Sequence, residues 1–294
     1  MTAASSLHRP FIPRDHPLAW VLGAPRASAH DDHVRQRRLQ ALHAPGELHA
    51  AVLALLLTPG SRSELEHWQL ETRDIGAAAR VFDDVQGLAR AEALPWLELL
   101  LERLARAPLA QRQALLSASR RLMAADGQVR AQDRLHWLLL RHRLGGTPPA
   151  PVNGTGPCDN ELSLLGAAQV QAIAVFSAFL SVMVPLPEMD VPIDPDGERW
   201  YAAVLAHWPY HQPLLPAREL PDADATGRAL RVVQALPWML RPVLVRLWHE
   251  AALALSGGPS LHPEAADALR LSCVLLDSPL PPWLARQYIE PDRR

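Results

Sequence analysis

The residues most suggestive of catalysis form the segment HEAAL, from His249 to Leu253. A zinc metallopeptidase needs two histidines one helical turn apart and a glutamate after the first, because both imidazoles must reach one zinc ion while the carboxylate activates its water. Leu253 occupies the position of the second histidine, so we expect His249 and Glu250 to be ordinary helix residues. The sequence also has no GxSxG motif, glycine-rich phosphate loop or dinucleotide fingerprint. It therefore predicts a protein that is not an enzyme and has no cofactor.

Asp126 and Asp133 could supply oxygen ligands to a cation, and Asp84 is the further carboxylate that could join them. Calcium takes six or more oxygen ligands, so this set is small. The alternative is a turn at Asp126-Gly127 that needs these residue types for its backbone conformation. Asp126 and Asp133 are the candidate metal ligands of the sequence.

A second possible metal site is the run His30-Asp31-Asp32-His33, whose two histidines would share one face of a helix. A third ligand could come from His16 or His43. Metal ligands need rigid support, whereas we expect this part of the chain to be mobile. The alternative is a solvated turn or the start of a helix.

An aromatic cluster lies in a proline-interrupted part of the chain, and it could form an exposed surface for a protein partner. Its members are Trp200, Tyr201, Trp208, Tyr210 and His211. Other tryptophans fall in apolar helical stretches, where core packing is expected: Trp96, Trp137, Trp238, Trp248 and Trp283.

The composition of the 294 residues favours an all-α protein, because 49% are hydrophobic but only 5% are aromatic. The net charge is −2 and there is no long basic stretch, so we expect no nucleic-acid partner. Cys158 and Cys273 are far apart in sequence, which favours a reducing compartment. With no apolar core in the first 20 residues to act as a secretory signal, we expect a cytoplasmic protein.

The stretch from Leu162 to Pro187 has no charged residue and is long enough to span a bilayer. Its glutamines and serines, and the acidic residues Glu161 and Glu188 at its ends, argue against a span. We therefore expect a buried helix and no integral membrane segment.

These elements predict a helical bundle of two units built on αα-hairpins. Residues 1–45 are expected to be a partly disordered arm, 46–146 the first unit, 147–160 a linker, and 161–294 the second unit. The expected helices cover Glu47–Leu57, Ser63–Leu70, Ile75–Glu92, Trp96–Arg106, Leu109–Ala125, Ala131–Leu144, the uncharged stretch, Arg199–His207, Asp224–Leu236, Pro242–Leu255 and Glu264–Leu276.

A weak internal repeat links the segments LMAADGQVRAQDRLHWLLL and ALSGGPSLHPEAADALRLSCVLL. Each has a helix, a glycine turn, an apolar residue (Val129 or Leu261) and a second helix. The alternative is that any αα-hairpin would match this loosely.

The segment LLSASRRLMAADGQVRAQDRLHWLLLRHRLG, residues 115–145, resembles the helix, Asp-Gly turn and helix of TerB-like (tellurite-resistance B) domains. In that family an acidic residue commonly follows the turn, where Gln132 and Asp133 stand here. Further pieces between Glu47 and Leu284, among them LHAAVLALLL and LRLSCVLLDSPLPPWL, are similar to the C-terminal cytoplasmic region of bacterial HtpX-like membrane zinc metallopeptidases.

The resemblance implies a non-catalytic cytoplasmic module whose protein partner belongs to a membrane metallopeptidase system. None of the catalytic residues of those peptidases can be carried over, because the zinc motif is incomplete and their transmembrane helices have no counterpart here. The alternatives are a TerB-type metal- or stress-response binding protein and an enzyme of an unfamiliar type. The oligomeric state is left open.

Overall fold

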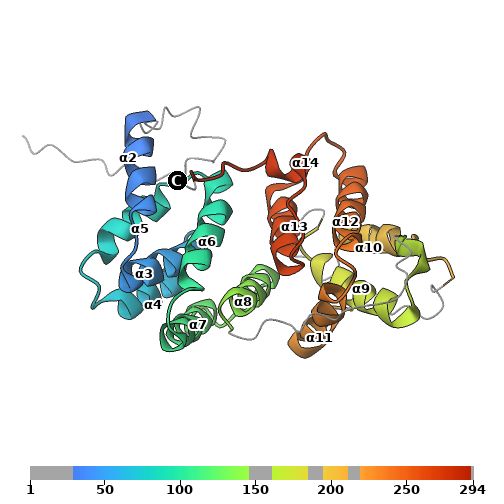
Figure 1. Ribbon diagram of the computed structural model, residues 1–294, viewed down its shortest axis with the longest axis horizontal. Coiled ribbons are helices and arrows are strands. Elements are labelled where there is room, and N and C mark those ends of the chain that lie inside the picture. The colour runs from blue at the N-terminus through green and yellow to red at the C-terminus, as the bar shows by residue number, and fades with distance from the viewer. Residues whose placement is uncertain (1–28, 146–160, 185–194, 211–218, 293–294) are drawn as a thin grey trace, which may run out of the picture.

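The structure, a computed structural model, describes residues 29–145, 161–184, 195–210 and 219–292 (Figure 1). These residues form thirteen α-helices and one 3-10 helix, without a β-strand, so the all-α prediction is confirmed. The elements are α2 (Ala29–Gln40), α3 (Pro45–Leu55), α4 (Arg62–Thr72), α5 (Ala78–Gln86), α6 (Arg90–Leu104), α7 (Leu109–Met123), α8 (Ala131–Leu144), the 3-10 helix η1 (Leu162–Leu164), α9 (Ala167–Leu180), α10 (Pro195–Leu205), α11 (Ala223–Gln234), α12 (Leu240–Ser256), α13 (Pro263–Leu275) and α14 (Pro282–Ala285).

Helix α3 is the centre of the N-terminal half, where it packs against α4, α5, α6 and α7. Its sequence from Ala50 to Leu55 is apolar on every side, and a helical segment of that kind must be surrounded by others. All residues from Ala50 to Ala54 are accordingly buried. Trp68 of α4 packs over it and donates a hydrogen bond of 3.0 Å from Nε1 to the carbonyl oxygen of Ala50.

Within the arm that was expected to be partly disordered, residues 29–40 form a helix that was not predicted, α2. Residues 1–28 lie outside the described residues. Leu39 is buried, and Arg38 pairs with Asp84 of α5. The guanidinium of Arg103, on α6, donates to the carbonyl oxygens of Gln40 and Leu42 at 3.0 Å. Contacts with distant segments therefore hold α2 in place. The polar sequence of α2 does not by itself predict a helix there.

The predicted helices at 75–92 and 96–106 divide at a different place. Helix α5 ends at Gln86, and α6 begins at Arg90 with Pro95 inside it. The side chain of Glu92 accepts a hydrogen bond of 2.8 Å from the backbone N–H of Ala89, which fixes the start of α6 there. Sequence reasoning placed the start at Pro95 because proline is favoured in a first turn.

The uncharged stretch forms η1, α9 and a short turn, and most of α9 is buried against α10 and α11. Its Ser177 accepts a hydrogen bond from Nε1 of Trp248, on α12, at 2.9 Å. No helix among the described residues has the length and apolar character needed to cross a membrane.

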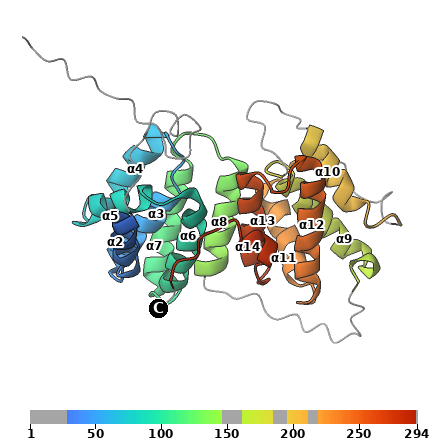
Figure 2. The same ribbon diagram turned by 90° about the horizontal axis from the view of Figure 1, so that it is seen from above.

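Helix α8 joins the two halves of the molecule, since it contacts α6 and α7 on one side and α13 on the other (Figures 1 and 2). The predicted linker, 147–160, lies outside the described residues. Across this contact, Arg270 of α13 bonds both carboxylate oxygens of Glu98 on α6, at 2.6 and 3.0 Å. Buried apolar residues of both halves belong to one core cluster.

The two segments of the predicted repeat both form helical hairpins, α7 with α8 and α12 with α13. Their turns differ, however. Gly257 follows α12 directly, as a left-handed cap with φ of 64°. Gly127, with φ of 76°, comes four residues after the end of α7. The two turns are therefore not equivalent position by position.

Candidate functional site

Asp126 closes the turn between α7 and α8. One of its carboxylate oxygens accepts a hydrogen bond of 2.9 Å from the backbone N–H of Gln128, as in an Asx turn. The other accepts one of 3.1 Å from the guanidinium of Arg130. Both oxygens therefore stabilise the turn itself.

Asp133 lies in the first turn of α8, where its carboxylate accepts a hydrogen bond of 2.9 Å from the backbone N–H of Arg130. This caps the helix. Burial raises the pKa of Asp133, the nearby charges of Glu64 and Asp126 raise it further, and the bond from Arg130 opposes them. The third carboxylate, Asp84, is bonded to Arg38.

His16 and the side chain of His30 lie outside the described residues. Within the described residues, no group of three histidine, cysteine, aspartate or glutamate side chains is placed to hold a metal ion. In the histidine run, Asp32 pairs with Arg35 at 2.7 Å, so this segment is the start of a helix.

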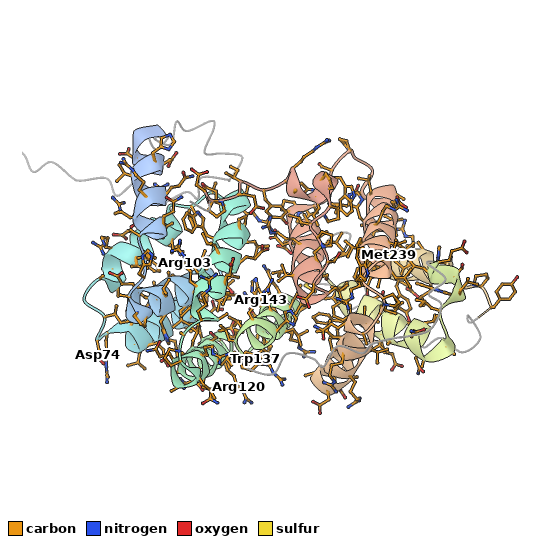
Figure 3. The ribbon with its side chains drawn as sticks, in the orientation of Figure 1. Asp74, Arg103, Arg120, Trp137, Arg143 and Met239 are labelled. Carbon is orange, nitrogen blue, oxygen red and sulfur yellow. The ribbon has the colours of Figure 1, made fainter. Side chains whose placement is uncertain are left out.

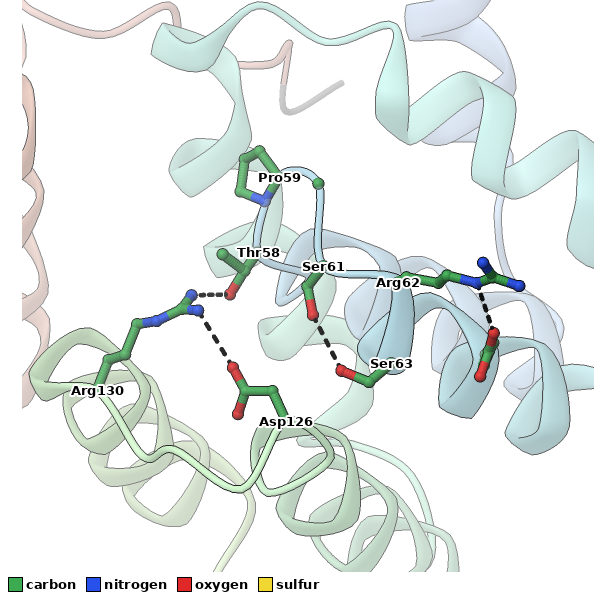
Figure 4. Close-up of a pocket in the computed structure, with 9 residues that line it drawn as sticks. Thr58, Pro59, Ser61, Arg62, Ser63, Asp126 and Arg130 are labelled. Atoms are coloured by element: carbon green, nitrogen blue, oxygen red, sulfur yellow. Dashed lines mark hydrogen bonds and ion pairs between the residues drawn. The ribbon is translucent and has the colours of Figure 1, made fainter.

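A polar pocket of about 630 Å³ opens beside Asp126, between the α7–α8 turn and the loop that precedes α4 (Figure 4). Arg130 joins its two walls, since its guanidinium donates to Thr58 Oγ1 at 2.7 Å and to Asp126. The wall residues are Thr58, Pro59, Gly60, Ser61, Arg62, Ser63, Glu66, Asp126 and Arg130. They include hydroxyls and charges of both signs but no histidine or cysteine, so this lining has neither a strong nucleophile nor an imidazole base.

The predicted aromatic partner surface is wrong for three of its five residues, because Trp200, Tyr201 and Trp208 are buried. The indole N–H of Trp200 donates a hydrogen bond of 3.0 Å to the carbonyl oxygen of Trp248, deep between α10 and α12. Prolines interrupt the chain around these residues without exposing them. Tyr210 is exposed, and His211 lies outside the described residues.

The exposed aromatic side chain that sequence reasoning missed is Trp238, of which 73% is accessible. We expected it in the core with Trp96 and Trp248, which are indeed buried. It precedes α12, and Met239 beside it is also exposed. Pro237 was the available signal, because a proline between two apolar helices marks a turn.

A mostly apolar groove of about 310 Å³ lies along the first two turns of α12, the helix that follows Trp238 and Met239 in the chain. Met239, Pro242, Val243 and Arg246 follow one another at helical spacing along one side of α12, and the last three line the groove. Its other wall is the segment Pro279–Trp283. We call these residues, together with Trp238, the α12 groove.

His249 and Glu250, from the incomplete zinc motif, lie further along α12. The imidazole of His249 stacks on the ring of Trp283, with 3.7 Å between the ring centroids. Burial lowers the pKa of His249, although Glu250 opposes the shift. His249 thus packs against the segment that forms one wall of the α12 groove.

Comparisons of the chain with family models, curated proteins and solved structures gave no significant match. The resemblance to TerB-like domains and to the HtpX-like cytoplasmic region stays a prediction from the sequence.

Proposed function

We propose that this chain is a non-catalytic helical module that binds a partner protein through the α12 groove. The observation that carries the proposal is the exposure of Trp238 and Met239, 73% and 45%, beside a mostly apolar groove. Tryptophan and methionine are enriched in protein interfaces, and contiguous exposed apolar side chains commonly mark a binding surface.

The size and lining of the groove favour one or two apolar side chains of a protein over a free small molecule. Its volume of about 310 Å³ is at the lower end of the roughly 300–1,000 Å³ of ligand pockets. Arg246 is the one charged residue in its lining, and that arginine is paired with Glu250 at 3.7 Å. The occupant we propose is therefore an apolar anchor segment of the partner.

The resemblance to the HtpX-like cytoplasmic region suggests that this partner belongs to a bacterial membrane metallopeptidase system and that binding takes place in the cytoplasm. The alternative, a metal- or stress-response binding protein of TerB type, has less support because Asp126 and Asp133 are already bonded to the turn and helix they stabilise. If thermal unfolding shifts when a chelator, calcium or zinc is added, that alternative regains weight.

The test is affinity purification with the full chain and with a double variant, Trp238→Ser and Met239→Ser. Both side chains are exposed, so the variant should unfold at the wild-type midpoint. We expect a specific protein to be recovered with the wild-type chain and lost with the variant.

A matched control removes exposed apolar side chains elsewhere, by Leu70→Ser and Val129→Ser, at 57% and 51% exposure. It should retain the partner. Recovery of the same proteins with both variants, or of none with the wild-type chain, would argue against the α12 groove as the contact surface.

A further inference from the structure

The outer side of the α7–α8 hairpin combines arginines with half-buried apolar side chains, at a distance from the α12 groove. On α8, positions 134, 137, 138 and 141 share one side of the helix. The opposite side, with Leu135, Leu139 and Leu140, is buried in the core. On α7, Leu116 and Arg120 lie one turn apart. We call this surface the basic face: Leu116, Arg120, Arg134, Trp137, Leu138 and Arg141.

The hairpin carries a strong local excess of positive charge. Residues 109–144 contain seven arginines and two aspartates, although the whole chain has a net charge of −2. Arg121 is neutralised by Glu71. The side chains of Arg120, Arg134 and Arg141 form no hydrogen bond or ion pair with any residue that the structure describes.

Apolar side chains lie among these cations. Leu116, Trp137 and Leu138 are only partly buried at the edge of the core. Arg120 and Trp137 lie on the same side of the hairpin, whereas Arg143 is on the other side of α8 (Figure 3). The basic face therefore combines an indole and two leucines with three guanidinium groups that have no partner among the described residues.

We infer that the basic face binds an acidic protein segment that also carries aromatic or aliphatic side chains. Guanidinium groups match carboxylates in a bidentate geometry. The partly buried Trp137 and its leucine neighbours give apolar residues of the same segment a surface to pack on. This inference is independent of the α12 groove.

Two other polyanions fit the face less well. The apolar side chains of the face are partly buried in the hairpin, so they cannot insert into a bilayer as an interfacial helix does. A nucleic acid is favoured by a row of cations that follows its backbone. Here Arg134 and Arg141 lie one turn to either side of Trp137 and Leu138 on the same side of α8, an alternation of charge and apolar surface that is complementary to a mixed acidic and apolar peptide.

The test uses a fluorescent random copolymer of glutamate and tyrosine as the probe, with polyglutamate as its purely acidic counterpart. We expect the full chain to bind the copolymer more tightly than polyglutamate, with an affinity that falls as salt is added. The triple variant Arg120→Glu, Arg134→Glu and Arg141→Glu should weaken binding at least about tenfold. Trp137→Ala should abolish the preference for the copolymer.

A charge-matched control carries Arg73→Glu, Arg228→Glu and Arg286→Glu, three exposed arginines elsewhere on the surface. It should bind the copolymer like the wild-type chain, and circular dichroism should show the same helical content in every variant. Equal loss of binding in the control would reduce the effect to net charge and overturn the inference. The inference would also be overturned if the full chain did not bind the copolymer at low salt, or if it bound anionic vesicles or a single-stranded oligonucleotide more tightly than the copolymer.

Discussion

The backbone N–H of Ile289 donates a hydrogen bond of 3.0 Å to the carbonyl oxygen of Ala91. Within α6 that carbonyl would accept from residue 95, but Pro95 has no N–H to donate. The Ala91 carbonyl, which Pro95 leaves without a donor inside the helix, is thus paired by the C-terminal segment, almost 200 residues further along the chain. Gln40 of α2 continues this attachment by donating to the carbonyl oxygen of Asp292 at 3.1 Å.

Replacing Pro95 by alanine should loosen the C-terminal segment. The new N–H at position 95 would compete for the Ala91 carbonyl, so the amide of Ile289 should lose protection in hydrogen exchange measured by NMR. Pro45→Ala, which changes a first-turn proline of α3, should leave the exchange of Ile289 as in the wild-type chain. Unchanged exchange in Pro95→Ala would mean that this hydrogen bond does not hold the segment.

Removing Arg270 should destabilise the contact between the two halves strongly. This side chain is 2% exposed and bonded to both Glu98 and Glu290. Arg270→Met would leave the Glu98 carboxylate, 17% exposed, without its partner, and breaking such a pair costs roughly 3–5 kcal/mol. Urea unfolding measures the free energy directly.

Glu290→Gln is the matched control, because Glu290 is 45% exposed and an exposed pair contributes about 0–1 kcal/mol. The double variant Arg270→Met with Glu98→Leu should recover part of the lost stability, because the less exposed of the two carboxylates left without a partner is removed, and Glu290 is open enough to be hydrated. A loss below 1 kcal/mol in Arg270→Met would show that the pair adds little to the contact.

Local signals in the sequence predicted the helices whose ends are set locally. Helix α8 begins and ends at the predicted residues, Ala131 and Leu144, because Asp133 caps its first turn and Gly145 follows its last residue. Helix α2 and the start of α6 were predicted wrongly. Arg103 holds α2 from another helix, which the local sequence does not show. The start of α6 is set by the local cap of Glu92 on Ala89, and the Ala91 carbonyl that Pro95 cannot pair accepts from the distant Ile289.

Both local and distant contacts decided the outcome for the candidate sites. Asp126 was identified as a possible ligand from its residue type, but its oxygens are used by the turn that contains it. Trp200 and Trp238 both stand near prolines, yet one is buried and the other is 73% exposed. Which of them meets a neighbouring helix depends on how α10 and α12 pack, and proline spacing does not encode that packing.

His136 should make the protein less stable as the pH falls. Burial lowers its pKa to about 4, and its Nε2 atom has no hydrogen-bond partner among the described residues. The unfolded chain takes up a proton near pH 6.5 and the native chain only near pH 4, so stability declines across this window by about 3 kcal/mol. His136→Leu should remove this decline.

The measurement for His136 is the free energy of unfolding between pH 7 and pH 4.5, taken as the difference between variant and wild type. The difference is needed because burial raises the pKa of Asp267 to about 6, which makes stability fall as the pH rises through that value. His43→Leu, at an exposed position, should keep the wild-type pH dependence. Parallel curves for His136→Leu and wild type would contradict a buried neutral imidazole.

Trp200→Ala and Trp238→Ala should differ sharply in their effect on stability. Trp200 is fully buried and its indole is hydrogen-bonded, so its loss leaves a cavity and removes that hydrogen bond, at a cost of roughly 3–5 kcal/mol. Trp238 is mostly exposed, and its loss should change the free energy of unfolding by no more than about 0.5 kcal/mol. Urea unfolding of both variants decides between a free and a packed Trp238. If Trp238→Ala destabilised the chain as much as Trp200→Ala, its ring would be part of the core, and the α12 groove would lose the side chain most suited to hold a partner.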